Sequence, residues 1–431
     1  MSREMKDSGI EWIGKIPEDW EVVKLGVVAD ISTGNTPTDP DNIKYSKSEG
    51  VDWLKTNNLL GVDGVSNSSL KIKEQYISEA RLTNPRSVLI TCIGDIGKLG
   101  YTSKPVAFNQ QINSITFTKD IVYWKYGMYA LYSQREQQES FANGNVLKIL
   151  NRENQKKVVI TVPKDINKQI KISNALDKIC LYIRKLVDKT QLSIKELKKY
   201  KQSLITEAVT KGFDSTVEMK DSGIEWIGKI PKHWQTIKMK YLLSTPLLYG
   251  ANEPGVPYQE DLPRYIRITD ILNNNKLSDI NKLSLSLEKA KSFFLKENDI
   301  LFARSGASVG KTFLISKENV NDTFAGYLIK ASFKDNVNAK YIFLFTQSYA
   351  FENWKNAITI QSTIQNIGAN RYNNLIISLP TYEEQQQIVQ YLDSKISAID
   401  NIIADKTKVI EELENYKKSL IYEYVTGKKE V

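Results

Sequence analysis

The chain has 431 residues, 41% of them hydrophobic and 25% charged, and its 59 Lys and Arg against 50 Asp and Glu give a formal net charge of +9. This composition is that of a globular protein and excludes a largely disordered chain, and the length favours about two to four domains. The basic excess fits a polyanionic partner such as nucleic acid, and it fits an ordinary basic globular protein equally well.

Cysteine usage and hydropathy bear on the compartment. Cys92 lies in an apolar strand-like run and Cys180 in a helical pattern, and two such thiols favour a reducing compartment without a metal cluster. No apolar run approaches the roughly 18 residues that cross a bilayer, and the opening residues MSREMKDSG lack a signal-peptide core. We therefore expect a cytoplasmic protein with no membrane partner.

An internal repeat organises the sequence. Residues 5–17 read MKDSGIEWIGKIP, residues 219–231 repeat the same letters without a mismatch, and a Trp follows each copy at Trp20 and Trp234. Identity over such a particular stretch indicates that the chain is a duplication of one unit.

The region after the first copy of the repeat, residues 20–163, has the pattern of a mixed α/β globule. Strand-sized apolar runs bounded by turn residues occupy residues 87–94, 113–117 and 157–163, and a single helix is predicted over residues 122–141. The region after the second copy repeats this plan, with strand-like runs at residues 298–306 and 374–380.

Each globular region leads into a long helix with apolar residues at alternating spacings of four and three. Such spacing predicts a coiled coil, and a Gly near each end, Gly212 or Gly427, supplies the C-terminal cap. The predicted interface residues are Ile172, Leu176, Ile179, Ile183, Leu186, Leu197 and Leu204 in the first helix and Leu392, Ile396, Ile399, Ile403, Leu413 and Leu420 in the second.

Two lysines interrupt the apolar stripes. Lys201 and Lys417 occupy apolar positions of the pattern, and each follows a tyrosine, Tyr200 or Tyr416. A polar residue at a coiled-coil interface can fix the register. We favour the alternative, in which both lysines extend to solvent beside their tyrosines.

The expected fold class is therefore α/β (mixed α+β) globular domains in two copies, separated by two long antiparallel coiled-coil helices, with a pseudo-two-fold internal repeat. The predicted domains are residues 1–163, 164–212, 213–380 and 381–431. Helices of about 45 residues, or roughly 65 Å, are too long for either to be buried alone. Two-fold pairing would make them antiparallel, with one globular domain near each end.

Catalytic constellations are absent from the sequence. The single histidine, His233, replaces Asp19 of the other copy, which argues against a general base and against a His-rich metal site. The run RSGASVGKT at residues 304–312 has three residues between Gly306 and Gly310, where a P-loop requires four, and we predict a strand–turn–strand instead. Neither an Asn-Pro-Pro-aromatic motif nor GxGxxG after a strand occurs. We expect a binding scaffold without catalysis, metal or cofactor in this chain.

Three blocks of sequence resemble the specificity subunit of type I restriction-modification systems over nearly the whole chain. They are IEWIGKIPxxW at residues 10–20 and 224–234, the Gly-Lys turns around Gly97-Lys98 and Gly310-Lys311, and QNIGANRYNNLIISLPTYEEQQQIVQYLDSKI at residues 365–396. The counterpart of the last block, residues 158–179, keeps a Pro, Gln and Ile but has Lys168 in place of the Glu, so the match is weaker there.

This resemblance implies a mechanism. Each globular domain, as a target-recognition domain, would read one half of a split, asymmetric site in double-stranded DNA, and the helices would set the gap. Such subunits bind two modification subunits, which use S-adenosylmethionine, and two restriction subunits, which use ATP and Mg²⁺. The repeated peptide would pack where the end of one long helix meets the next globular domain.

Candidate DNA-binding residues lie in polar loops, because Arg and Lys suit guanine and phosphate whereas Asn and Gln suit adenine. For any one of them, a solvated turn is an equal alternative. The candidates are Asn35, Thr36, Lys55, Asn57, Lys98, Asn109 and Gln110 in the first copy and Tyr249, Asn252, Arg267, Thr269, Arg304, Ser305 and Lys311 in the second.

Two other functions remain open. A fragment of a fused methyltransferase and nuclease would need the missing Asn-Pro-Pro-aromatic motif. A structural scaffold would bind protein rather than DNA, and would show no salt-dependent DNA affinity.

Overall fold

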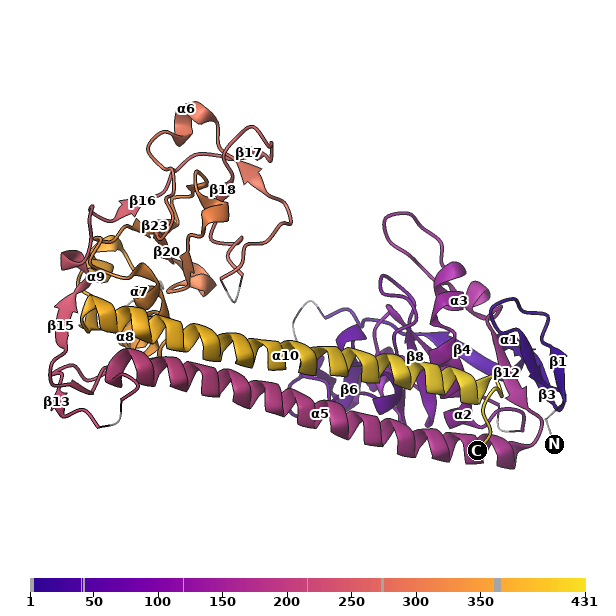
Figure 1. Ribbon diagram of the computed structural model, residues 1–431. Helices are drawn as coiled ribbons and strands as arrows, with labels where there is room; N and C mark the ends of the chain where they lie inside the picture. The colour runs from indigo at the N-terminus through magenta and orange to yellow at the C-terminus, as the bar shows by residue number, and fades with distance from the viewer. Residues whose placement is uncertain are drawn as a thin grey trace. The chain divides into compact units, whose positions relative to one another are not determined.

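The computed structural model describes residues 4–39, 41, 43–118, 120–214, 216–272, 275–359 and 366–431 (Figure 1). The chain divides into two compact units: the first unit is Met1–Gln191 with Lys408–Val431, and the second unit is Leu192–Thr407. Gln365, the first residue of one of the sequence blocks above, lies outside the described residues.

The first unit is built on two four-stranded sheets, of order β4-β11-β8-β9 and β10-β6-β7-β5, with a two-stranded sheet β12-β3 and a hairpin β1-β2. The strands are β1 (Met5–Asp7), β2 (Lys15–Pro17), β3 (Trp20–Lys24), β4 (Ala29–Thr33), β5 (Tyr45–Ser46), β6 (Val51–Leu54), β7 (Lys71–Ile72), β8 (Ser87–Thr91), β9 (Leu99–Thr102), β10 (Ala107–Phe108), β11 (Ile112–Phe117) and β12 (Val159–Pro163). The helices are α1 (Leu25–Val28), α2 (Trp124–Ser133), α3 (Arg135–Ser140), α4 (Arg152–Gln155) and the long α5 (Ile166–Lys211), with 3-10 turns η1 (Thr56–Asn58), η2 (Gly61–Asp63) and η3 (Glu74–Glu79).

The second unit repeats this topology, with a four-stranded sheet β16-β23-β20-β21, a hairpin β13-β14 and the pairs β15-β24, β17-β19 and β18-β22. The strands are β13 (Met219–Asp221), β14 (Lys229–Pro231), β15 (Gln235–Lys238), β16 (Leu248–Tyr249), β17 (Val256–Pro257), β18 (Tyr265–Ile266), β19 (Leu283–Ser284), β20 (Ile300–Ala303), β21 (Thr312–Leu314), β22 (Thr323–Phe324), β23 (Leu328–Ala331) and β24 (Ile376–Leu379). The helices are α6 (Leu287–Ala290), α7 (Ala339–Phe345), α8 (Tyr349–Thr359), α9 (Ala369–Asn373) and the long α10 (Tyr382–Val425), with 3-10 turns η4 (Met239–Tyr241), η5 (Gly306–Ser308) and η6 (Lys317–Asn319).

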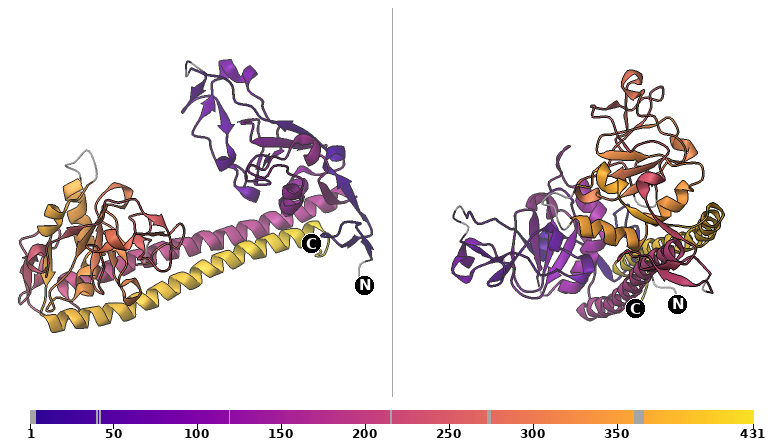
Figure 2. Two further views of the ribbon diagram at one scale, coloured as in Figure 1. Left: turned by 90° about the horizontal axis from the view of Figure 1, so that it is seen from above. Right: turned by 90° about the vertical axis from the view of Figure 1, so that its left-hand side faces the viewer.

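Both long helices contribute to the core of both units, because the division between units falls inside each helix. In the first unit, Leu176 and Ile183 of α5 share a core with Leu420 and Ile421 of α10. In the second unit, Ile205 and Val209 of α5 share a core with Ile388 and Leu392 of α10. Within each unit the two helical segments lie side by side (Figure 2).

The helical segments run in opposite directions. In the second unit, Lys201 pairs with Asp400 at 2.7 Å, whereas the later Phe213 stacks on the earlier Tyr391 with ring centroids 5.6 Å apart. The two α/β globular regions and the two long helices therefore confirm the predicted fold class.

The predicted coiled-coil residues are all buried or half-buried. Ile172, Leu176, Ile183, Leu392, Ile399 and Leu420 are buried, and Ile179, Leu186, Leu197, Leu204, Ile396, Ile403 and Leu413 are half-buried. The four-three pattern missed Val187, Ile205, Val209 and Ile421, which are also buried. These four widen the apolar face because each helix packs against its globular region as well as against the other helix.

The solvent-facing interpretation of the two lysines is wrong. The side chains of Lys201 and Lys417 are only 20% and 10% exposed, and their ammonium groups pair with Asp400 at 2.7 Å and Glu414 at 2.6 Å. The Lys201–Asp400 pair crosses between the helices, so it can contribute to the register.

The repeated peptide closes each unit at a helix end, as predicted. In both copies it forms a hairpin of the same register, β1-β2 and β13-β14, followed by a buried tryptophan. Gly427, at the end of α10, has φ +71°, and a Cβ there would lie 2.5 Å from Pro17 Cδ. Gly212, at the end of α5, has φ +75° and lies against Trp234. A side chain at either glycine would strain the junction.

A buried tyrosine ties each helix end to its sheet. The Tyr126 hydroxyl lies 2.8 Å from the Thr161 carbonyl and 3.0 Å from the Val425 carbonyl. The Tyr341 hydroxyl lies 2.7 Å from the Ser378 carbonyl and 3.0 Å from the Val209 carbonyl. The two units thus share one device for holding the last residues of a long helix.

One local prediction needs correction and another is confirmed. Residues 122–141 form two helices, α2 and α3, because Gln134 leaves helical geometry with φ −104° and ψ 26°. Its side-chain oxygen instead accepts hydrogen bonds from Trp12 Nε1 at 3.2 Å and Gln137 Nε2 at 2.9 Å. The run at residues 304–312 is the turn between β20 and β21, so the strand–turn–strand prediction is confirmed.

One half-buried carboxyl makes the second unit sensitive to pH. Burial raises the pKa of Asp322 from its usual 3.8 to about 6, against a smaller lowering by the hydrogen bond from Asn319. The native carboxyl keeps its proton to higher pH than the unfolded one, so the free energy of unfolding falls as pH rises from about 4 to 6. We expect Asp322→Asn to raise the melting temperature of the second unit at about pH 7.5 and to change it little at about pH 3.5. Calorimetry at both pH values tests this, and an equal shift at both would contradict it.

Candidate nucleic-acid interface

In the two units, strands of the central sheet end in structurally equivalent segments. In the first unit, the Cys92 N–H donates to the Gln111 carbonyl at 2.8 Å and the Leu150 N–H donates to the Cys92 carbonyl at 2.8 Å. In the second unit, the Arg304 N–H donates to the Tyr327 carbonyl at 3.0 Å and the Ile367 N–H donates to the Arg304 carbonyl at 2.8 Å. Arg304 therefore occupies the place of Cys92, and Tyr327 that of Gln111.

A glycine in the adjacent strand extends this equivalence. The Gly34 N–H donates to the Ile112 carbonyl and the Gly250 N–H to the Leu328 carbonyl, both at 3.1 Å. The preceding residues, Thr33 and Tyr249, are thus equivalent as well. We define the first rim as Thr33, Asn35, Thr36, Cys92, Asn109, Gln110 and Gln111, and the second rim as Tyr249, Asn252, Arg304, Ser305 and Tyr327.

Close backbone approach explains why both rims need the glycine. A Cβ at Gly34 would lie 2.2 Å from the Phe108 carbonyl oxygen, and one at Gly250 would lie 2.4 Å from the Phe324 carbonyl oxygen. Any side chain would push the two rim segments apart. The scaffold is therefore shared between the units although the side chains on it differ.

The first rim is rich in amides. Thr36 donates its hydroxyl hydrogen to Gln110 Oε1, and Asn109 Nδ2 donates to Gln111 Oε1 at 3.0 Å. Gln110 is exposed, Gln111 is half-buried and Asn109 is buried. The structure brings the candidates Asn109, Gln110 and Thr36 together, and a polar, uncharged surface results.

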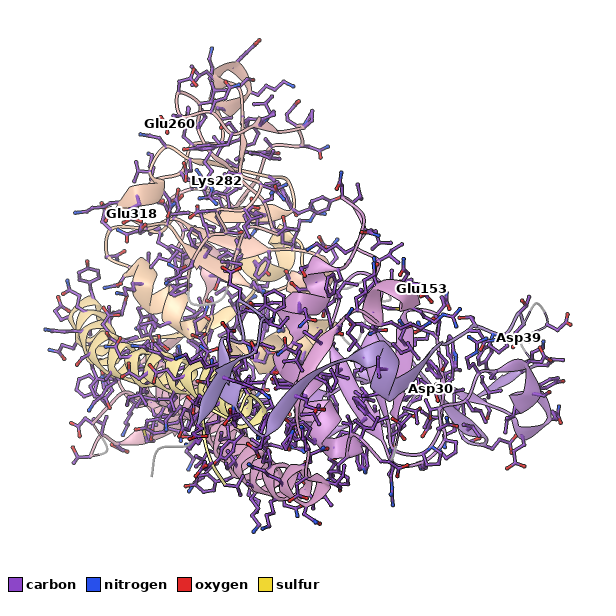
Figure 3. The ribbon with its side chains drawn as sticks, turned by 90° about the vertical axis from the view of Figure 1, so that its right-hand side faces the viewer. Asp30, Asp39, Glu153, Glu260, Lys282 and Glu318 are labelled. Atoms are coloured by element: carbon purple, nitrogen blue, oxygen red, sulfur yellow. The ribbon has the colours of Figure 1, made fainter. Side chains whose placement is uncertain are left out.

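Asn35 holds this rim to the neighbouring segment. Its Nδ2 donates to the Glu79 carbonyl at 2.7 Å, and its Oδ1 accepts from the Arg81 N–H at 2.7 Å. Beyond Thr36, the Asp39 carboxylate (Figure 3) accepts hydrogen bonds from the Ile43 and Lys44 N–H groups at 2.8 and 3.0 Å. The bonds to Glu79 and Arg81 occupy one donor and one acceptor of the Asn35 amide, so they hold this side chain in place.

Lys55 and Asn57 adjoin the first rim. The Asn109 N–H donates to the Leu54 carbonyl at 3.1 Å, which places Lys55 beside the rim. The Lys55 ammonium lies 5.0 Å from the centre of the Trp53 ring, a cation–π distance. Asn57 is exposed in η1. Lys55 can therefore supply positive charge next to the amides of the rim.

The second rim contains a stacked cation. The Arg304 guanidinium carbon lies 4.9 Å from the centre of the Tyr249 ring, and the Tyr249 hydroxyl accepts a hydrogen bond from the Ala369 N–H at 2.9 Å. Tyr327 is 61% exposed beside them. Asn252 is exposed after Ala251, whose carbonyl accepts from the Gly326 N–H at 2.7 Å, and Ser305 bridges to Asn366.

Arg267 adjoins the second rim as Lys55 adjoins the first, because the Ala325 N–H donates to the Ile266 carbonyl at 2.9 Å. Arg267 and Thr269 lie in a turn closed by the buried Asp270. Arg267 Nη2 lies 2.8 Å from Asp270 Oδ1 and 2.9 Å from the Asn281 carbonyl. The hydrogen bonds that Arg267 donates to the Asp270 carboxylate raise the pKa of Arg267 further above its usual value. The Asp270 carboxylate offsets the positive charge of Arg267, which would otherwise attract a phosphate. Thr269 is exposed.

The backbones of Lys98 and Lys311 lie close to the rims, because their carbonyls accept from the Thr91 N–H at 2.9 Å and the Ala303 N–H at 2.8 Å, and their side chains line cavities. Lys98 lines a surface cavity of about 820 Å³ with Trp12, Arg135 and Tyr422. Lys311 lines one of about 550 Å³ in the second unit, with Lys201 and Asp400 of the long helices. The Gly-Lys turns therefore face the helices of their own unit.

Sequence patterns missed four rim residues: Thr33, Cys92, Gln111 and Tyr327. Gln111 was inside a candidate loop, and Tyr327 would have been found by pairing Ala325-Gly326-Tyr327 with Asn109-Gln110-Gln111.

The outer part of the second unit carries charges of both signs, including Glu260, Glu318 and Lys282 (Figure 3). Lys282 pairs with Asp279 at 2.7 Å.

The described residues contain no cluster of three or more His, Cys, Asp or Glu side chains placed to hold a metal ion. Among the same residues, no helix has both the length and the apolar character to cross a membrane.

Comparison with known proteins gives one consistent family. Residues 17–196 and 253–414, more than half of the chain, match the model of the type I restriction modification DNA specificity domain. The chain is 21% identical over 441 residues to the type I restriction enzyme EcoBI specificity subunit of Escherichia coli, covering 99% of this chain and 90% of that protein. It is 24% identical over 430 residues to the MjaVIII specificity subunit of Methanocaldococcus jannaschii, covering 96% and 94%.

A solved structure supports the fold. A chain from work on complex assembly and conformational transition of the type I R-M system superposes with a TM-score of 0.70 at 14% identity, covering 95% of this chain and 98% of that one. The family match over more than half of the residues carries the assignment: this chain belongs to the type I restriction-modification DNA specificity subunits.

Proposed function

We propose that this chain recognises a bipartite, asymmetric site in double-stranded DNA for a type I restriction-modification complex, with each globular region reading one half. One observation supports this most directly. The rims sit on equivalent backbones but carry unlike side chains, Cys92 and Gln111 against Arg304 and Tyr327. Two copies of one scaffold with different reading groups suit two different half-sites.

The long helices, in this proposal, fix the distance between the two readers and provide docking surfaces for two modification subunits. α5 has 46 residues and α10 has 44, so each is about 66 to 69 Å long at 1.5 Å per residue. Half-sites one turn of DNA apart, about 34 Å, lie within such a span.

The chemistry belongs to partner subunits in this proposal. The modification subunits would bring S-adenosylmethionine and methylate the DNA, and two restriction subunits would use ATP and Mg²⁺. This chain would bind and position DNA without reacting with it. Its own residues offer neutral amides, one stacked guanidinium and nearby lysines, which are groups for recognition rather than bond making.

Methylome sequencing of the source organism with the gene intact and deleted tests the proposal. We expect a bipartite motif with a fixed unspecified gap to lose adenine methylation on deletion, and reintroduction of the gene to restore it. Identical methylomes in a host that expresses the chain and its modification subunit would contradict the proposal.

A further inference from the structure

We propose that Arg304 reads a guanine in the half-site bound by the second unit. This inference rests on the proposed function, and it adds a base identity and a residue to it. Arg reads guanine through two parallel hydrogen bonds to O6 and N7 in the major groove, which requires a planar donor group held in one orientation.

The Tyr249 ring provides that orientation. The guanidinium carbon lies 4.9 Å from the ring centre, so the planar group is restrained by a cation–π contact. Tyr249 is itself fixed, because its hydroxyl accepts from the Ala369 N–H at 2.9 Å. Arg304 is also fixed at its backbone, which exchanges hydrogen bonds with Tyr327 and Ile367. The donor group is thus held in place before DNA arrives, which lowers the entropy cost of binding.

Among the described residues, part of the hydrogen-bonding capacity of Arg304 is unused. Its Nε is buried, and within the described ranges no atom accepts a hydrogen bond from it. No ion pair to Arg304 occurs in that part of the chain either, in contrast to Arg267, which Asp270 neutralises. The terminal nitrogens of this half-buried guanidinium have no ion-pair partner in the described part of the chain, so they can donate to a ligand, whereas the buried Nε cannot reach one. Guanine supplies two acceptors in the geometry that fits the group.

The first rim lacks an equivalent cation. Its corresponding residue, Cys92, is 3% exposed, and the exposed rim residues Thr36 and Gln110 are neutral. The cation that adjoins this rim, Lys55, lies over the Trp53 ring instead of in the place of Arg304. Loss of the Arg304 guanidinium should therefore alter one half of the DNA site and leave the other half unchanged. This asymmetry separates base reading from a general contribution to DNA affinity.

The test is methylome sequencing of cells that carry the complete complex with Arg304→Gln. We expect the motif to keep its gap and one of its halves. At one position of the other half, the preference for guanine should fall by about tenfold to a hundredfold. Glutamine pairs well with adenine, so adenine should be admitted at that position. Lys317→Gln is the control, because it removes an exposed cation distant from the rim in sequence and should leave the motif intact.

Tyr249→Leu tests the same inference independently, should Arg304→Gln prevent folding. It removes the ring but keeps the arginine. The preference for guanine at the same position should fall by about tenfold, because the guanidinium is then less well oriented. An unchanged motif with full methylation in a folded variant would overturn the inference. So would an equal loss across both halves, which would indicate phosphate contact. If the wild-type chain itself directs no bipartite methylation, it is the proposed function that fails.

Discussion

A chain that ends at Thr407 is expected to lose the folded structure of the first unit and to keep that of the second. Residues Lys408–Val431 belong to the first unit, although Gln191, where the rest of that unit ends, lies far away in the sequence. This segment places Leu420, Ile421, Tyr424 and Val425 in the first core, all less than 9% exposed. The second unit is the continuous segment Leu192–Thr407 and loses nothing.

The expected cost is comparable to the whole stability of a domain. Burying one large apolar side chain contributes about 1.5 to 3 kcal/mol, so four contribute about 6 to 12 kcal/mol. Domains are typically stable by only about 5 to 15 kcal/mol. Truncation also removes the Val425 carbonyl that the buried Tyr126 hydroxyl contacts at 3.0 Å. The first unit should therefore be unfolded or molten.

Calorimetry and limited proteolysis measure this outcome. We expect one melting transition of the full chain to disappear, and a protease to degrade residues 1–191 while a fragment near 192–407 survives. A chain that ends at Lys429 is the matched control, because the two residues it loses, Glu430 and Val431, are both exposed. Persistence of both transitions after truncation at Thr407 would refute the assignment.

A permuted chain should restore the first unit alone. Residues 408–431, joined by a short flexible linker to residues 1–191, contain every segment of that unit. Described residues a few positions from the two ends lie near each other: a Cβ at Gly427 would lie 2.5 Å from Pro17, and Pro17 pairs with Met5. We expect this permuted chain to fold, and we expect the same chain without residues 408–431 to remain unfolded.

The parts of the fold that follow repeated or periodic patterns could be predicted from the sequence. The identical peptides led directly to the two hairpins at the helix ends, because Gly, Pro and Trp at fixed offsets determine local geometry. The four-three spacing gave the long helices to within a few residues. It missed Ile205 and Val209, because the pattern describes one partner helix whereas these residues face a globular region as well.

Most rim residues were among the candidates, but the equivalence of the two rims could not be predicted, because each rim joins residues from separate strands. Cys92 and Arg304 are equivalent, and so are Gly34 and Gly250, but the two pairs are separated by different numbers of residues, since loop lengths differ between the copies. Aligning the two halves of the sequence therefore does not match the rim residues. Motif resemblance instead favoured Lys98 and Lys311, which line cavities beside the helices.

Lengthening both long helices by three heptads is expected to lengthen the gap of the recognised motif by about nine base pairs and leave both halves unchanged. The insertions belong after Gln191 and after Thr407, where the units divide, so that neither unit is altered. This result follows from the proposal that the helices set the spacing between the readers.

Length and rotation both decide the size of the insertion. Twenty-one residues add about 31.5 Å, close to the roughly 30.6 Å of nine base pairs at about 3.4 Å each. Nine base pairs rotate the DNA by about 45° less than a full turn. Three heptads leave the helix face about 60° short of a whole number of turns, which is a rotation in the same sense. The two readers should therefore still meet the same groove face, about 15° from the original phase.

A single heptad in each helix is the matched control. It adds about 10.5 Å, or three base pairs, but three base pairs rotate the DNA by about 105° while the helices turn by about 20° in the opposite sense. The second reader would face the wrong side of the duplex, and methylation should be lost although the protein folds. Methylome sequencing reads out both variants. If the gap stays unchanged with three heptads, or if one heptad works as well as three, the helices do not set the spacing.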